Sequence, residues 1–112
     1  MLESIKEDNM LLLNIDYIPN KEIEVLGLVK GTTVHCKHLG KDFMAAMKTL
    51  VGGEIVDYTE MLIEARQIAT LRMVEEAKKL GADAVINVHY GSAAIMQGAA
   101  EVIVYGTAVK TK

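Results

Sequence analysis

The hydrophobic positions follow two different spacings along the chain, and each spacing predicts one kind of element. Residues 57–80 carry apolar side chains at intervals of three and four, which predicts a long helix. Residues 23–36 alternate between two faces, which predicts a long strand, and Gly27 and Gly31 within it favour a bend. Residues 84–90 and 101–110 are apolar runs and predict two further strands. The pattern is typical of an α+β protein.

Both ends of the predicted long helix carry recognisable signals. Asp57 and Glu60 resemble a capping box in which Asp replaces Ser or Thr. Lys78 and Lys79 suit the negative end of the helix dipole, and Gly81 is the expected stop. This helix is therefore the most clearly marked element of the chain.

Shorter patterns complete the predicted architecture. Residues 11–15 are an apolar run that stops at Asp16, which predicts a first strand. Residues 42–50 have helical spacing and are followed by two glycines, which predicts a short helix. Residues 91–100 are small and mostly uncharged and are expected to form a mobile loop. We expect a flexible lead-in over 1–9 and a single domain over 10–112.

The two strands after the long helix contain almost no charge. Between residues 84 and 109 only Glu101 is charged, whereas the strands of a sheet with one solvent-exposed face should alternate apolar and polar side chains. One helix layer covers one face of a sheet and leaves the second face open. On strict alternation that second face carries Val85, Ile103, Tyr105 and Val109. We expect it to pack against other copies of the chain in a closed ring or barrel; the alternative is that residues 1–22 fold back over it.

Composition narrows the class of protein further. The chain has 112 residues, of which 51% are apolar, and its core must be aliphatic because it has four Tyr, one Phe and no Trp. A net charge of −3 with scattered Lys and Arg argues against nucleic-acid binding. The acidic start lacks the features of a secretory signal, and no apolar run approaches the ~18 residues of a membrane span. We therefore expect a cytoplasmic protein without a membrane partner.

One short segment groups side chains that bind soft metals. His35, Cys36 and His38 fall within four residues, and imidazole and thiolate suit zinc or copper. On an extended strand Cys36 and His38 share a face while His35 points the other way, so a complete site needs His89 or a second chain. The alternative is that these are surface residues at a strand end with an ordinary half-buried cysteine.

Signals for catalysis are missing from the sequence. Ser92 and Thr107 have no identifiable base and acid partners, and the glycines before Glu54 lack the Lys and Ser/Thr of a phosphate loop. We therefore expect a non-enzymatic protein with no catalytic residues. The alternatives are a purely structural or partner-binding oligomer and an enzyme whose site lies between subunits.

Several motifs, in a fixed order from Leu12 onward, resemble the YbjQ-like family of small bacterial proteins. They are Gly27-Leu28-Val29-Lys30-Gly31, Val51-Gly52-Gly53, Leu80-Gly81-Ala82-Asp83-Ala84-Val85-Ile86 and Tyr105-Gly106-Thr107-Ala108-Val109. The resemblance implies a dodecin-like β-α-β subunit, assembled as a homopentamer, with a role in heavy-metal binding. After the third strand, family members often carry acids or an Arg followed by an aromatic residue and Asp. This chain has His89 and small residues there, which argues against a site for calcium or magnesium.

These observations give one expectation for the whole protein. We predict an α+β subunit in which a small antiparallel sheet packs with one long and one short helix, within a ring of identical chains. Such a ring would bind a soft metal, zinc or copper, or another small ligand at the boundaries between subunits, with Cys36, His38, His35 and His89 as the candidate ligands.

Overall fold

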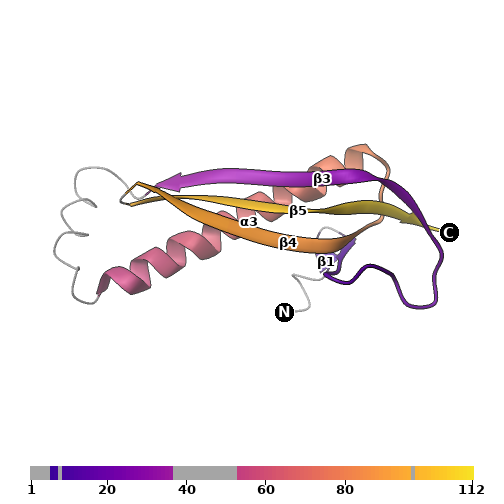
Figure 1. Ribbon diagram of the computed structural model, residues 1–112, viewed down its shortest axis with the longest axis horizontal. Helices are drawn as coiled ribbons and strands as arrows, with labels where there is room; N and C mark the ends of the chain where they lie inside the picture. The colour runs from indigo at the N-terminus through magenta and orange to yellow at the C-terminus, as the bar shows by residue number, and fades with distance from the viewer. Residues whose placement is uncertain (1–5, 8, 37–52, 97) are drawn as a thin grey trace.

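The computed structural model describes residues 6–7, 9–36, 53–96 and 98–112, and within them it has the predicted α+β class (Figure 1). A five-stranded sheet has the order β1-β2-β4-β5-β3, and one long helix lies against it. The elements are β1 (Lys6–Glu7), β2 (Met10–Leu12), β3 (Ile23–Cys36), α3 (Gly53–Lys79), β4 (Ala84–Met96) and β5 (Ala99–Thr111). The short helix predicted over residues 42–50 lies outside the described residues.

The prediction of the long elements is confirmed, with four corrections. β3 has the bounds that the sequence predicts, whereas α3 spans Gly53–Lys79 instead of 57–80, so Asp57 and Glu60 lie inside the helix and not at its start, where a capping box would be. The sheet is mixed rather than antiparallel, because β2 pairs with β4 in parallel. The mobile loop predicted over residues 91–100 is wrong: β4 continues to Met96 and β5 begins at Ala99, so the two strands form a long hairpin. The predicted strand over 11–15 shortens to Met10–Leu12.

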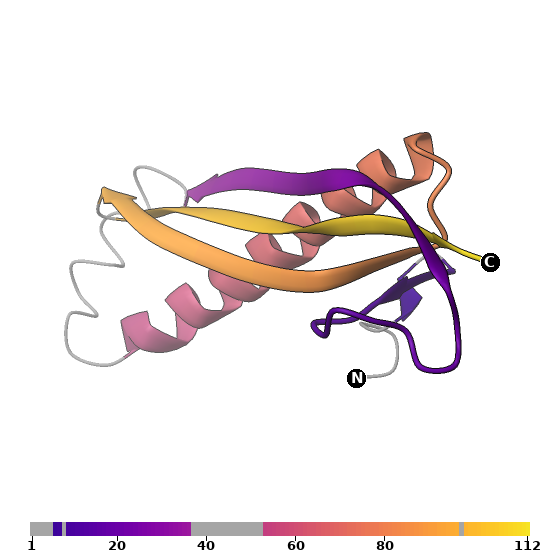
Figure 2. The same ribbon diagram turned by 45° about the vertical axis from the view of Figure 1, so that its right-hand side comes forward.

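Helix α3 crosses one face of the sheet diagonally, mainly over β3 and β5 (Figures 1 and 2). Four side chains that it buries fully against the sheet are Ala65, Ala69, Met73 and Ala77, three of which are alanines. Small side chains let the helix backbone approach the strands closely. The two backbones come very close at Gly31 of β3, where an added Cβ would collide with the carbonyl oxygen of Ala69 and lie 2.6 Å from the backbone nitrogen of Met73.

Among the described residues, the opposite face of the sheet is covered at one end only. Residues 13–22 run past the start of β4 and the end of β5 (Figure 2), and Ile18 is buried there against Ala84, Ile86 and Val109. The extended segment before it is bonded to β4, since the amide of Leu13 donates to the carbonyl of Val85 at 2.9 Å. Part of the N-terminal segment thus folds over the second face, which was the alternative expected from the sequence. In the described residues it covers only the end of the sheet where β4 begins and β5 ends.

Asp83, in the turn between α3 and β4, is hydrogen-bonded to Thr111, the last residue of β5. Its carboxylate accepts hydrogen bonds from the Thr111 amide at 3.0 and 3.2 Å and from the Thr111 hydroxyl at 2.7 Å. Partial burial by itself raises the pKa of Asp83, but the Thr111 bonds and nearby Lys110 outweigh it, so the pKa lies below its usual value. The ionised form therefore stabilises the fold.

Replacing Asp83 by Asn should lower the free energy of unfolding by about 1 kcal/mol at neutral pH, because a charge-assisted bond is lost at a partly exposed site. A carboxyl with a depressed pKa contributes its stability above the usual Asp value of about 4 and loses it as the pH falls through the folded-state pKa. The difference between wild type and Asp83→Asn should therefore shrink below about pH 4 in guanidinium unfolding at fixed protein concentration. Asp16→Asn, at an exposed loop position, is the control; an equal effect there would contradict this role.

Candidate functional site

Most of the sheet surface that faces away from α3 has no covering element among the described residues. We call it the outer face. Its residues are register partners on neighbouring strands. The residues between them along each strand, such as Val29, Val102 and Val104, lie on the other face and pack under α3. Its members are Leu28, Lys30, Thr32 and Val34 of β3, Glu101, Ile103, Tyr105 and Thr107 of β5, and His89, Gly91 and Ala93 of β4.

Large apolar side chains on the outer face are exposed to solvent. Leu28 is 69% exposed, Val34 56% and Tyr105 42%. These positions lie on one face of two adjacent strands, β3 and β5, and Thr107, Lys30 and Glu101 are their register partners. Exposed apolar surfaces of this kind are typical of interaction sites.

A β-bulge in β4 decides which side chains reach the outer face. Register pairs Ile86 with Thr107 and His89 with Tyr105, so two residues of β4, Asn87 and Val88, oppose one residue of β5. Asn87 has the left-handed φ of 56°. The expectation of strict alternation was therefore wrong for β4. Val85, expected on the second face, is buried under α3, and Val88 and Tyr90 lie on the same face as Val85. Val109 is covered by residues 13–22 and does not belong to the open surface.

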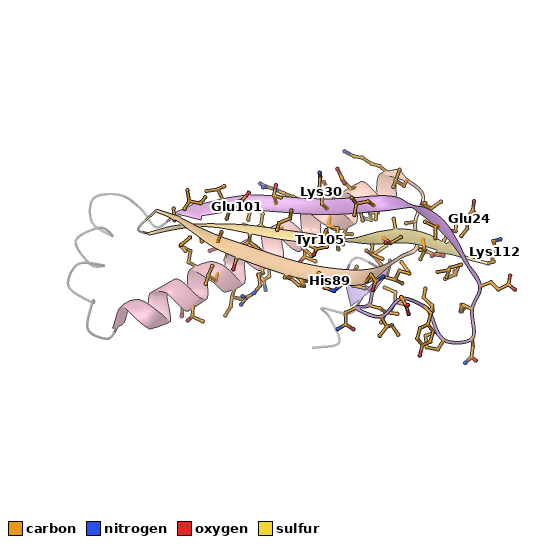
Figure 3. All side chains as sticks on the ribbon, in the orientation of Figure 1. Glu24, Lys30, His89, Glu101, Tyr105 and Lys112 are labelled. Carbon is orange, nitrogen blue, oxygen red and sulfur yellow. The ribbon has the colours of Figure 1, made fainter. Side chains whose placement is uncertain are left out.

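The bulge also fixes the orientation of His89. The His89 Nδ1 atom lies 2.9 Å from the backbone carbonyl oxygen of Asn87, two residues earlier. The imidazole ring stacks on the Tyr105 ring with centroids 5.6 Å apart and planes inclined by 17°. On the other side of β5 from His89, Lys30 of β3 is the register partner of Tyr105. Lys30, Tyr105 and His89 thus form one polar row across three adjacent strands, as the labelled side chains in Figure 3 show.

The other predicted metal ligands lie at the far end of β3. Register pairs His35 with Ala100 and Cys36 with Ala99, near the β4–β5 turn. The side chains of these two residues, and the whole of His38, lie outside the described part of the structure. Whether the three residues bind a metal therefore stays a prediction.

One protomer does not bring His89 to Cys36. Their partners on β5, Tyr105 and Ala99, are six residues apart. At about 3.3 Å per residue this places the two positions roughly 20 Å apart along the sheet. In the described residues no three His, Cys, Asp or Glu side chains come close enough to hold one metal ion. Within the described part of one chain, His89 therefore has no complete set of metal ligands around it.

The face under α3 holds a polar contact that the sequence did not indicate. The Thr70 hydroxyl donates to the Arg66 carbonyl at 2.7 Å, and the Tyr90 hydroxyl lies 3.0 Å from the Thr70 oxygen. Because the Thr70 proton is already used, Tyr90 is the donor in the second bond. This chain of bonds holds β4 to the helix.

Sequence reasoning missed the bulge, although one residue could have revealed it. Asparagine is uncommon inside strands and is enriched in the left-handed region of backbone conformations. Asn87 in the middle of an apolar strand was therefore a signal for a bulge, and the bulge determines that His89 faces the same way as Tyr105.

Comparison with known proteins agrees with this fold. The family model YbjQ_1, described as "Putative heavy-metal-binding", matches residues 10–112. A UPF0145 protein of Clostridium novyi is 67% identical over 101 residues, which cover 90% of this chain and 98% of that protein. A UPF0145 protein of Thermus thermophilus is 56% identical over 102 residues, 90% of each chain.

A solved structure shares the same fold at low sequence identity. The crystal structure of a protein of unknown function from Pediococcus pentosaceus, of the DUF74 family, superposes with a TM-score of 0.62 at 16% identity and covers 94% of this chain and 100% of its own. No helix in the described part of this chain is long and apolar enough to cross a membrane. The match of one family model to nearly the whole chain, with relatives at 56–67% identity, shows that this chain belongs to the YbjQ_1 family of UPF0145 proteins.

Proposed function

We propose that this protein is a non-enzymatic homo-oligomer, a ring of five copies as its family resemblance implies, that binds a soft heavy metal or another small ligand at the boundaries between subunits. The observation that carries the proposal is the exposed outer face. Leu28, Val34 and Tyr105 would be removed from water if another copy packed on it. Burying one such side chain is worth about 1.5–3 kcal/mol, so several together favour association.

The edge of the sheet supports contact through the face rather than through strand pairing. β3 is an edge strand, and an uncovered edge of this length could pair with another chain. Two side chains of α3 occupy that edge: Glu76 accepts a bond from the Lys30 amide at 3.3 Å, and Arg72 donates to the Thr32 carbonyl at 2.7 Å. A neighbouring strand could not pair with residues 30–32 without displacing both.

The distribution of metal ligands supports a site between copies. The family description names heavy-metal binding, and imidazole and thiolate are ligands for zinc and copper. The described residues of one chain supply no group of three such ligands. A structural zinc site needs four ligands, so we place the proposed site at a boundary, where two copies can supply them together.

Native mass spectrometry of the untagged protein, with elemental analysis of the same sample, tests both parts of the proposal. We expect a single oligomer at micromolar concentration and saturable uptake of zinc or copper. A monomer at that concentration would contradict the assembly. An oligomer that takes up no metal and shows no thermal shift with metals would leave a purely structural or partner-binding ring.

A further inference from the structure

Residues 13–18 follow β2 and contact the sheet at the bulge of β4, and we call them the strap. We propose that the strap and the outer face are coupled through Asn87. While the strap is bound, Asn87 keeps its left-handed backbone and its carbonyl orients the His89 ring; when the strap is released, Asn87 changes conformation and His89 leaves Tyr105. The coupling lies within one chain, so it depends neither on the proposed assembly nor on a bound metal.

Backbone hydrogen bonds join the strap to both residues of the bulge. The Asn87 amide donates to the Ile15 carbonyl at 2.9 Å. The Val88 amide donates to the Leu13 carbonyl at 3.0 Å. Successive amides of a regular strand point to opposite sides, whereas these two point to the same side, toward the strap. The strap therefore binds the bulged form of β4 and would lose one of these bonds if β4 became a regular strand.

One apolar side chain anchors the strap. Ile18 is 6% exposed and packs against Ala84, Ile86 and Val109, whereas residues 14–17 are exposed. Segments with few buried apolar contacts open at a lower free energy than the core of a domain. Releasing the strap therefore requires the loss of one buried side chain and a few hydrogen bonds, and it leaves α3 packed on the sheet.

The bulge has a second conformation available to it. Asn87 has a φ of 56°, in the left-handed region that residues other than glycine rarely adopt. Bulges with the same two residues opposite one also exist with the first residue near the right-handed helical region. Asn87 can therefore change conformation without a shift of register between β4 and β5. The bonds to the strap favour the left-handed state, so the bulge is a two-state element that the strap biases.

Asn87 controls the orientation of His89 through one hydrogen bond. The Asn87 carbonyl oxygen lies 2.9 Å from His89 Nδ1 and can only accept, so Nδ1 carries the ring hydrogen. No other hydrogen bond joins the His89 ring to the described residues. The ring stacks on Tyr105 with centroids 5.6 Å apart. A change of backbone conformation at Asn87 turns this carbonyl away, and the exposed ring then leaves its position over Tyr105.

Amide hydrogen exchange and histidine ¹H–¹⁵N spectra of Ile18→Asp test the coupling. Loss of the Ile18 burial should release the strap, so the amides of Asn87 and Val88 should exchange at least about 10-fold faster than in wild type. In the same variant the share of His89 that is protonated on Nδ1 should fall, and the ring-current shift that Tyr105 causes in His89 should decrease.

Three further variants separate the coupling from a general loss of stability. Tyr17→Asp is the matched control, because Tyr17 is the neighbouring side chain and is 57% exposed; it should match wild type in both measurements. Asn87→Gly should also match wild type, since glycine adopts the left-handed region without strain. Asn87→Ala disfavours that region while the Ile18 anchor is intact, so it should change both the amide exchange and the His89 spectrum.

Coupling is reciprocal, so a change at His89 must loosen the strap. His89→Phe keeps a ring for the stack on Tyr105 and removes the bond at Nδ1. Exchange of the Asn87 and Val88 amides should then become roughly five-fold faster, the equivalent of one hydrogen bond.

Faster exchange in Ile18→Asp with an unchanged His89 spectrum would overturn the coupling, and so would wild-type exchange in His89→Phe. If Ile18→Asp exchanges like wild type, the anchor and the inference fail together. Equal effects in Tyr17→Asp and Ile18→Asp would also contradict it. Asn87 and His89 are exposed, so their variants carry the test if Ile18→Asp does not fold.

Discussion

Replacing Gly31 by alanine should destabilise this protein more than any other single-methyl addition to its strands. The new Cβ would meet the carbonyl oxygen of Ala69 and lie 2.6 Å from the Met73 amide nitrogen, both part of the α3 backbone. A backbone on a packed helix cannot move aside as a side-chain end can, so the helix must lift from the sheet and open its alanine-lined contact. We expect a loss of about 3 kcal/mol, out of the 5–15 kcal/mol typical of a domain.

Guanidinium unfolding followed by circular dichroism, at one fixed protein concentration, measures this loss, and the melting temperature should fall by roughly 10–20 °C. Gly91→Ala is the matched control, a strand glycine whose added Cβ would make ordinary contact with Ile103 at 3.5 Å. It should change stability by less than about 1 kcal/mol. Equal losses at the two glycines would show that strand conformation, not the close approach of α3, explains the effect.

Leu28→Asp should convert the proposed assembly into monomers. Leu28 is 69% exposed in the single chain, at the centre of β3, and the proposed contact would bury it. Losing the burial of a leucine is worth about 1.5–3 kcal/mol, and burying a carboxylate without a partner costs more. Each interface should thus weaken by more than about 10-fold, and a closed ring repeats the loss at every boundary. Light scattering after size-exclusion chromatography should give the monomer mass at micromolar concentration.

Leu71→Asp is the control for the outer-face prediction. Leu71 is a leucine of α3 that is 44% exposed, and it belongs to the helix layer rather than to the outer face. The same substitution there should leave the oligomer mass unchanged, and both variants should keep the far-ultraviolet circular dichroism of wild type. If Leu71→Asp separates the copies and Leu28→Asp does not, the chains meet through the helix layer.

The candidate site was predictable in its residue types but not in its geometry. His89 could be chosen from the sequence because imidazole is a metal ligand. The pairing of Cys36 with Ala99, the first residue of β5, could not be predicted, because register depends on the partner strand. The roughly 20 Å between the two positions follows only from that register. The sequence left two ways open to complete a site at Cys36, His89 or a second chain, and the register places His89 of the same chain at a separate position along the sheet.

Local signals were enough where an element depends mainly on its own residues. The glycine at 81 and the two lysines before it place the end of α3, and alternation over residues 23–36 gives the bounds of β3. Conformational preference and capping act within a few residues, so the sequence determines them directly. The α+β class follows from these elements in order.

Tertiary structure decided which face each side chain of β4 occupies. The bulge at Asn87 is stabilised by partners far along the chain: the Asn87 amide donates to the Ile15 carbonyl at 2.9 Å, and the Val88 amide donates to the Leu13 carbonyl at 3.0 Å. On β5, Gly106 has no side chain, and a Cβ added there would lie 2.7 Å from a γ-carbon of Val85. One extra residue reverses every following side chain, because alternation has a period of two. The sequence alone determined that the strands would be apolar; contacts distant in the chain determined that His89 and Tyr105 lie together on the open face.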